Sequence, residues 1–217
     1  MANVMTTSVF MYRTMINKLA FIVVLLGAAN AMATEEAEYT VVLEQQSFEL
    51  RSYAPHILAE TVVDGDFEDA GSKAFSRLFD YISGNNKTRQ EVKMTSPVSQ
   101  EAVSEKIDMT SPVGQQRQND RWAVSFMMPA AYSMTTIPEP TDPDVTLRQV
   151  PARYIAAITY SGFWSEERYL SNKDALDAWI EKQDFQVVGE PVWARYNPPL
   201  MPWFFRRNEI LVPIAKP

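Results

Sequence analysis

Very few of the residue types that carry catalysis or bind metals occur in this chain. Its 217 residues include one histidine, His56, and no cysteine. Cysteine nucleophiles and thiolate metal sites are therefore excluded, and a histidine-based triad or metal cluster would depend on His56 alone. The seven glycines are scattered and form no phosphate-binding loop. The 27 acidic residues permit carboxylate pairs, but no spacing singles out two of them. We predict no catalytic residue and no metal site, and hence a protein that is not an enzyme.

Apolar side chains of the kind that bind flat ligands are more prominent. The chain has eleven Met, eleven Phe and five Trp. Phe75 and Phe79 lie on one side of a predicted helix, and Met201 and Trp203 begin an apolar stretch in a proline-flanked loop. The loop could fold back over the core, or it could face the helix across a slot for a flat apolar ligand. The residues alone leave both interpretations open.

The elements that must position these residues are short strands and two helices. Residues 39–43, 48–53 and 56–63 are rich in β-branched and aromatic residues and predict strands. Gly65 then interrupts the chain, and Asp66 is suited to cap a helix over 67–82. That helix has an apolar stripe at spacings of three and four residues, which is typical of a core face. The stripe consists of Phe67, Ala70, Ala74, Leu78 and Tyr81.

An internal repeat organises the chain. Residues 48–65 align without a gap on 145–162 at an offset of 97 positions, and Gly65 falls on Gly162. Each glycine precedes a helical stretch, the second with Leu176, Trp179 and Ile180 on one face, and each half then returns to strands. We predict two strand–strand–helix–strand–strand units, over about 39–130 and 145–214, packed as one pseudo-symmetric domain.

A shorter repeat occurs within the first unit. Val92–Val98 and Ile107–Val113 both contain Met-Thr-Ser-Pro-Val, which suggests a hairpin of two similar strands. Residues 137–143 contain three prolines and suggest a linker between the two units.

The first 33 residues have the features of a secretory signal peptide. Basic residues precede an apolar run over 19–29, which ends in Ala31-Met32-Ala33. The run is too short to span a bilayer, which needs about 20 residues, so we favour a cleaved signal over a membrane anchor. We expect cleavage after Ala33, with Ala31 as the alternative, and a periplasmic or secreted monomer of residues 34–217. The possible start residues are Met1, Met5, Met11 and Met15.

The mature chain would be strongly acidic. Without residues 1–33 it has 18 basic and 27 acidic residues, a net charge of −9. Because phosphate backbones repel such a chain, we expect no nucleic-acid partner.

Four stretches, in this order, resemble the SOUL heme-binding family. They are Phe48-Glu-Leu-Arg-Ser-Tyr53, the Met-Thr-Ser-Pro-Val pair, Trp122-Ala-Val-Ser-Phe-Met-Met-Pro129, and Tyr196-Asn-Pro-Pro with Arg206-Arg-Asn-Glu-Ile210. The resemblance implies an α+β fold: a distorted antiparallel β-barrel with two helices and pseudo-two-fold symmetry, similar to GyrI-like effector-binding domains. With the signal peptide, it suggests an exported bacterial member.

The resemblance also implies non-covalent binding of heme or a related tetrapyrrole, by a carrier, buffer or scavenger. The groove would lie beside the first helix and near the C-terminal proline-rich loop. The site residues we expect are Ser72, Phe75, Phe79, Met201 and Trp203. Where characterised members place basic residues for the heme propionates, this chain has Ser72, Asp80 and Met201. The alternative is therefore a SOUL-fold small-molecule or protein-interaction domain that has lost heme binding. We interpret Arg206 and Arg207 first as structural partners of Glu209 or neighbouring acids, and His56 as a half-exposed strand-edge residue rather than an iron ligand.

Overall fold

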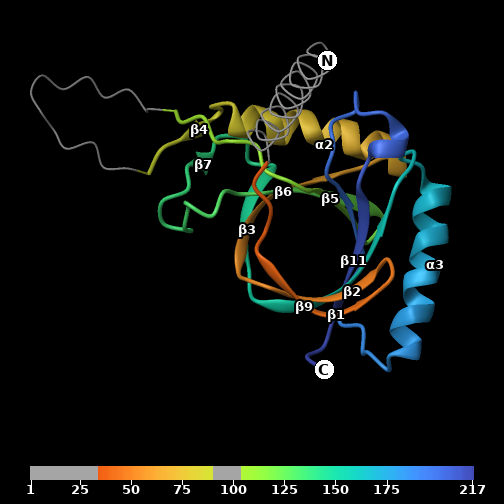
Figure 1. The fold of residues 1–217 in the computed structure, drawn as a ribbon. Coiled ribbons are helices and arrows are strands. Elements are labelled where there is room, and N and C mark those ends of the chain that lie inside the picture. Colours follow the sequence, from red (N-terminus) through yellow and green to blue (C-terminus); the bar gives the residue numbers. More distant parts are fainter. Residues whose placement is uncertain (1–33, 90–103) are drawn as a thin grey trace, which may run out of the picture. The chain divides into compact units, whose positions relative to one another are not determined.

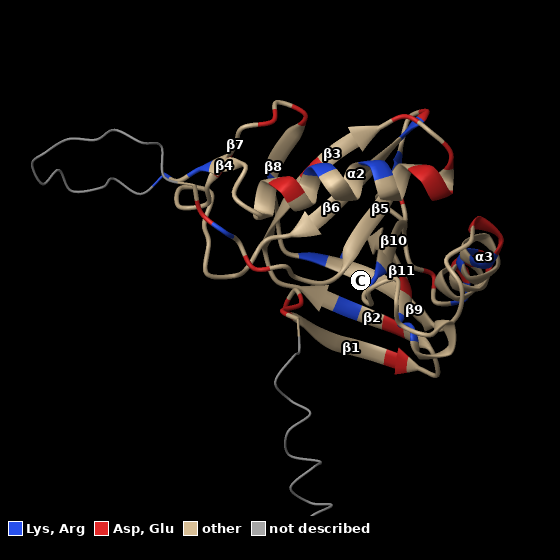
Figure 2. Cartoon of the chain, turned by 90° about the horizontal axis from the view of Figure 1, so that it is seen from above, with Lys and Arg blue, Asp and Glu red and all other residues tan. Residues whose placement is uncertain are grey.

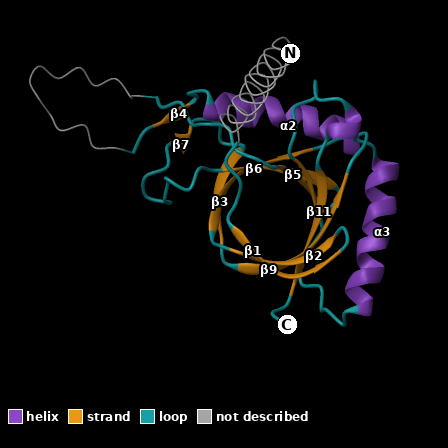
Figure 3. Ribbon diagram, viewed as in Figure 1, coloured by secondary structure: helices purple, strands orange, loops and turns teal. Residues whose placement is uncertain are grey.

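A computed structural model describes residues 34–89 and 104–217 of the protein. Nine strands form one curled antiparallel sheet, and two helices pack on its outer, convex face (Figures 1 and 3). The strands are β1 (Tyr39–Gln45), β2 (Phe48–Tyr53), β3 (His56–Val63), β5 (Val113–Gln118), β6 (Arg121–Met127), β8 (Val145–Val150), β9 (Arg153–Tyr160), β10 (Val192–Arg195) and β11 (Asn208–Ile214). The helices are α2 (Phe67–Ile82) and α3 (Glu166–Lys182). The predicted α+β barrel with two helices is confirmed, although the sheet stays open between β1 and β8.

The sheet order shows why the two repeats fold as one domain. The order is β1-β2-β9-β11-β10-β5-β6-β3-β8. Apart from β1, this order is symmetric: each strand of the first repeat is as far from one edge of the sheet as its equivalent in the second repeat is from the other edge. The first strand of each repeat pairs with the second strand of the other, β2 with β9 and β8 with β3. The register is also the same, since Phe48 faces Ile158 and Val145 faces Thr61. Neither repeat completes its sheet without the other.

Local signals account for both helices. The side chain of Asp66 accepts a hydrogen bond from the Asp69 amide at 2.8 Å, and Ser165 caps α3 in the same way at 3.4 Å. Gly65 and Gly162 precede them with φ of 139° and 132°, a region that a side chain would strain. The predicted helix over 67–82 has these bounds in the structure, and its predicted apolar stripe is buried.

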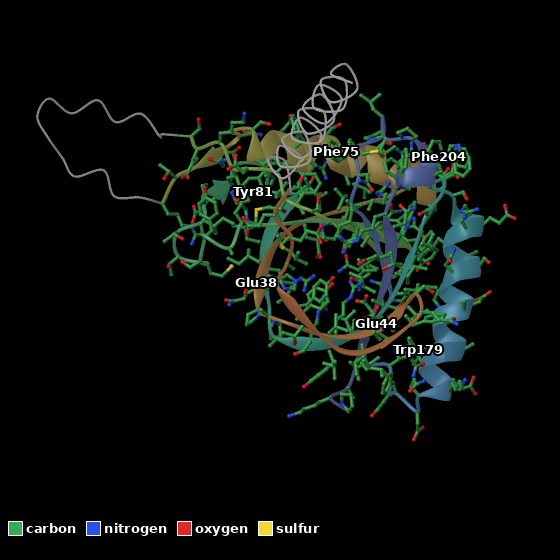
Figure 4. All side chains as sticks on the ribbon, in the orientation of Figure 1. Glu38, Glu44, Phe75, Tyr81, Trp179 and Phe204 are labelled. Carbon is green, nitrogen blue, oxygen red and sulfur yellow. The ribbon has the colours of Figure 1, made fainter. Side chains whose placement is uncertain are left out.

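The core has two parts, one under each helix. Ala74, Leu78 and Val124 belong to the part beneath α2, and Leu176, Trp179 and Ile210 to the part beneath α3. Figure 4 shows Trp179 between α3 and the sheet. Both helices therefore cover the convex face, and no helix formed by residues 34–89 or 104–217 lies on the concave face.

Two expectations about the connections need correction. The first Met-Thr-Ser-Pro-Val copy lies outside the described residues, and the second forms no strand before Val113, where β5 begins. Pro112 cannot donate to a sheet, and Ile107 is buried against the core instead. Residues 137–143 are more than a linker: β7 (Glu139–Pro140) pairs with β4 (Asn86–Lys87) in a second, small sheet, and Ile137 is fully buried.

A buried ionic cluster crosses the concave face of the sheet. The Glu209 carboxylate, which has no exposed surface, accepts from Arg51 at 2.7 and 3.0 Å and from Arg207 at 2.9 and 3.0 Å. Tyr196 and Thr159 donate hydroxyl hydrogen bonds to it at 2.7 and 3.1 Å. Burial alone would raise the pKa of Glu209, but the hydrogen bonds and charges, of Arg51 above all, hold it below its usual range.

Candidate functional site

Three of the predicted site residues share one exposed stripe of α2. Ser72 is exposed, Phe79 is 45% exposed and Phe75 is half-buried. The rings of Phe75 and Phe79 stack at 5.9 Å, and Phe75 also meets Phe126 at 5.3 Å. The stripe therefore presents the Phe79 ring to solvent, whereas the Phe75 ring also packs against the core beneath α2.

The other two predicted residues lie in the loop between β10 and β11. Its short 3₁₀ helix η1 (Trp203–Phe205) exposes three adjacent aromatic side chains, between 48% and 69%. Trp203 stacks on Phe163 at 5.2 Å, and Met201 is partly buried. No ring contact between this loop and Phe75 or Phe79 is recorded within residues 34–89 and 104–217. The structure thus places the predicted site residues in two groups, one on α2 and one in the β10–β11 loop, where Trp203 contacts Phe163. Figure 4 labels one aromatic residue at each place, Phe75 on α2 and Phe204 in the loop.

A stack of cationic and aromatic side chains joins the loop to α2. The guanidinium of Arg206 lies 4.3 Å from the ring centre of Trp164, and Arg195 lies 5.5 Å from the same ring. The guanidinium of Arg195 also lies 4.7 Å from the ring centre of Trp193. Its other neighbour is Gly71 of α2, the residue before Ser72: a Cβ added to Gly71 would lie only 2.7 Å from Arg195 Nη2. The chain of contacts therefore runs from α2 to the loop.

Neither arginine of this stack has a carboxylate partner in the described part of the chain. Arg206 donates to the carbonyls of Met201 and Pro199, both at 2.8 Å, which shapes the loop. The expectation that Arg206 pairs with an acid is therefore wrong, while Arg207 does pair with Glu209 and Glu36. Arg195 donates to Gln115 at 3.0 Å, and burial lowers its pKa to about 10. Two positive charges are thus available beside the exposed aromatics.

The sequence arguments missed Phe163, Trp164, Arg195 and Arg206 as members of this region. An aromatic pair after Gly162 was visible in the sequence as the end of the repeat. Nothing local, however, brings 162–164, 195 and 206 together; the antiparallel pairing of β9, β11 and β10 does that. His56, in contrast, lies on the concave side of the sheet, where Nδ1 is 3.0 Å from the Ala54 carbonyl oxygen.

Comparison with known proteins decides the family. The family profile described as SOUL heme-binding protein matches residues 34–213. This chain belongs to the SOUL heme-binding protein family. Heme-binding protein 2 of Homo sapiens is 25% identical over 173 residues, covering 75% of this chain and 80% of that protein. Heme-binding protein 1 of Xenopus tropicalis is 25% identical over 165 residues, covering 76% and 82%.

Solved structures agree with the fold of this SOUL chain. The C-terminal domain of EcmrR matches with a TM-score of 0.56 at 10% identity, over 82% of this chain and 99% of that one. EcmrR in a complex with DNA matches with a TM-score of 0.53 at 12% identity, over 98% and 70%. The predicted similarity to effector-binding domains is confirmed at the level of the fold. The expectation that this chain binds no nucleic acid continues to rest on its charge alone.

Proposed function

We propose that this protein binds heme or a related tetrapyrrole non-covalently on the face formed by α2 and the β10–β11 loop. The observation that carries the proposal is the exposed cluster of Phe163 and the three η1 aromatics, with Arg206 beside it. A cluster of four solvent-exposed aromatic side chains is typical of a binding surface. The family membership supports the same ligand class.

The available residues fit a flat apolar ligand with an acidic edge. The aromatic rings of the cluster and of Phe79 offer apolar area, and burying apolar area contributes about 25 cal/mol per Å². Arg206, and Arg195 beneath it, supply the positive charge that the positions of Ser72, Asp80 and Met201 lack. Guanidinium groups without a carboxylate partner suit propionate groups. We infer that apolar contact supplies most of the affinity and that Arg206 orients the ligand.

The role we propose is that of a carrier, buffer or scavenger rather than an enzyme, and an exported one. A heme would bring its iron, which can exchange axial ligands. His56 is on the other face of the sheet from α2, so we propose that it does not ligate this iron. The other candidate is a small-molecule or protein-interaction domain that has lost heme binding. Such a domain would give no Soret shift on titration with hemin.

Hemin titration followed by the Soret band tests the proposal. Phe79→Ala combined with Trp203→Ala should weaken binding at least tenfold, about 1.4 kcal/mol. Leu170→Ala, which removes a similarly exposed apolar residue (47%) from α3, is the matched control. His56→Ala should leave the Soret band and the affinity unchanged. The absence of a Soret shift, or a larger loss in His56→Ala than in the double variant, would overturn the proposal.

The role of Arg206 needs a separate comparison. Arg206→Gln should weaken hemin more than a porphyrin whose propionates are esterified, because only the free acids can bind a guanidinium. Equal loss for both ligands would show that Arg206 acts only through the shape of the loop.

A further inference from the structure

The concave face of the sheet holds a cavity that the proposed heme site does not use. All nine strands of the large sheet contribute to its walls, and the segment before β1 crosses one side. That segment is held by Arg207, which pairs with Glu36 at 3.0 Å, and by a bridge between Glu36 and Ser111. The cavity lies on the side of the sheet opposite α2 and α3, so what binds there is independent of the face described above.

The size of the cavity suits a small molecule. Its volume is about 70 Å³. One water needs about 10–15 Å³ on that measure, so the cavity holds roughly five to seven waters, or a ligand of a few heavy atoms. Leu58, Met127 and Ile155 give part of its wall an apolar character.

One positive charge in this cavity has no partner. Arg153, the first residue of β9, contributes a guanidinium whose Nε is buried and unbonded. Within the described residues it forms no ion pair and no hydrogen bond. The side chain as a whole is half-buried, but a buried polar atom without a partner, such as this Nε, costs stability unless something else satisfies it.

The other charges that line the cavity are already neutralised. Arg148 pairs with Glu60 at 2.9 Å, and Glu36 pairs with Arg207. The charge of Arg153 is therefore not offset from within the cavity, and burial together with Arg148 lowers the pKa of Arg153. The site attracts an anion and repels a cation.

His56 provides a second polar group at the same place. The Ala54 carbonyl can only accept a hydrogen bond, so the proton of the imidazole belongs on Nδ1, 3.0 Å away. Nε2 remains available, and an anion beside it would favour its protonation and make it a donor. Tyr53 packs against His56 with ring centres 6.2 Å apart and faces Arg153 in the β2–β9 register.

We propose that this cavity is a second binding site, for a small organic carboxylate held by Arg153 and His56. A planar carboxylate matches the two parallel donors of a guanidinium. The short apolar part of the ligand would lie against Leu58, Met127 and Ile155. No bond is made or broken, so the site is one of recognition.

Calorimetry and thermal shift with a defined series test this site. The probes are acetate, propionate, butyrate and succinate, with butyramide as a neutral match for butyrate and inorganic phosphate as a different anion. At a hundredfold excess over Kd, a bound carboxylate should raise the Tm by roughly 5–10 °C. Butyramide and phosphate should have no such effect. Equal binding of butyramide, binding of phosphate alone, or no binding in the series would overturn the proposal.

Two variants separate a binding role from a structural one. Arg153→Met should weaken the binding of the carboxylate at least tenfold. Without ligand, the variant should be as stable as the wild type or more stable, because a half-buried charge without a partner has gone. Arg121→Met, which removes an exposed arginine from β6, should change neither. Should Arg153→Met not fold, Arg153→Gln carries the same expectation. Unchanged affinity in the Arg153 variant, or an equal loss in Arg121→Met, would refute the site.

The ring signals of His56 locate the ligand. As the only histidine in the chain, it gives an unambiguous NMR signal, which the carboxylate should shift. Binding without that shift would place the ligand elsewhere. Hemin affinity should be the same in Arg153→Met and the wild type, so the two proposals can fail separately.

Discussion

Removing the charge of Glu209 is the most direct test of how the concave face is stabilised. In Glu209→Gln the side chain keeps its shape, but the charges of Arg51 and Arg207 lose the carboxylate that both contact at 2.7 to 3.0 Å. Arg51 is 1% exposed and Glu209 is fully buried, so water cannot replace the lost partner. Breaking a buried pair in this way costs about 3–5 kcal/mol. For a domain of this size, that corresponds to a fall in Tm of roughly 6–20 °C.

The control removes a second acid from the same arginine. Glu49 accepts from Arg51 Nε at 2.6 Å, but its side chain is 24% exposed. Because Arg51 keeps Glu209 in the Glu49→Gln variant, we expect a loss of about 1 kcal/mol or less. Both variants should be measured by urea unfolding at pH 7, with circular dichroism and tryptophan fluorescence as probes. The slope m should stay constant, so that the midpoint reports stability.

The lowered pKa of Glu209 adds a pH dependence with a definite sign. The folded state keeps this carboxyl ionised at pH values where the unfolded chain protonates it. Its contribution is therefore present above the ordinary glutamate pKa of about 4.3 and is lost as the pH falls through the folded value. A Glu209→Gln variant within 1 kcal/mol of the wild type, or no less stable than Glu49→Gln, would refute the reasoning.

Three further results are expected. The pKa of His56 should lie below 6.5 by NMR, because burial, and then Arg153, disfavour the imidazolium. Since the unfolded chain binds that proton more readily, stability should fall as the pH drops below about 6.5, and His56→Gln should remove this component; a pKa above 6.5 would contradict it. Gly71→Ala should destabilise by about 1–3 kcal/mol in urea unfolding despite the helix preference of alanine, because the new Cβ would lie 2.7 Å from Arg195 Nη2; a gain in stability would show that Arg195 can move away. N-terminal sequencing of the exported protein should find Thr34 or Met32 first, and recovery of the intact chain in membranes would count against a cleaved signal.

Export remains a prediction of the sequence, because residues 1–33 lie outside the described part of the protein. Among residues 34–89 and 104–217, no helix is long and apolar enough to cross a membrane. Charged residues of both signs are distributed over the fold rather than gathered on one face (Figure 2).

Elements with a local cause were predictable from the sequence. Asp66 and the apolar stripe determine α2, and the strands over 48–53 and 56–63 were read from β-branched and aromatic residues. The offset of 97 also predicted the symmetry, because two similar sequences have the same local preferences and so form the same elements. These signals act over a few residues, which is why one sequence was sufficient.

Tertiary structure decided everything that depends on residues distant in the chain. β5 contains the polar run Gly114-Gln-Gln-Arg-Gln118, which has little strand preference, and pairing on both sides with β6 and β10 makes it a central strand. Arg51 meets Glu209 across 158 positions, so no local pattern distinguishes them from exposed ions. In the same way, no local pattern in the sequence shows that Arg153 and Arg206 have no carboxylate partner among the described residues. Whether an arginine finds a carboxylate depends on which strands become neighbours, and that pairing is set by the burial of the whole sheet.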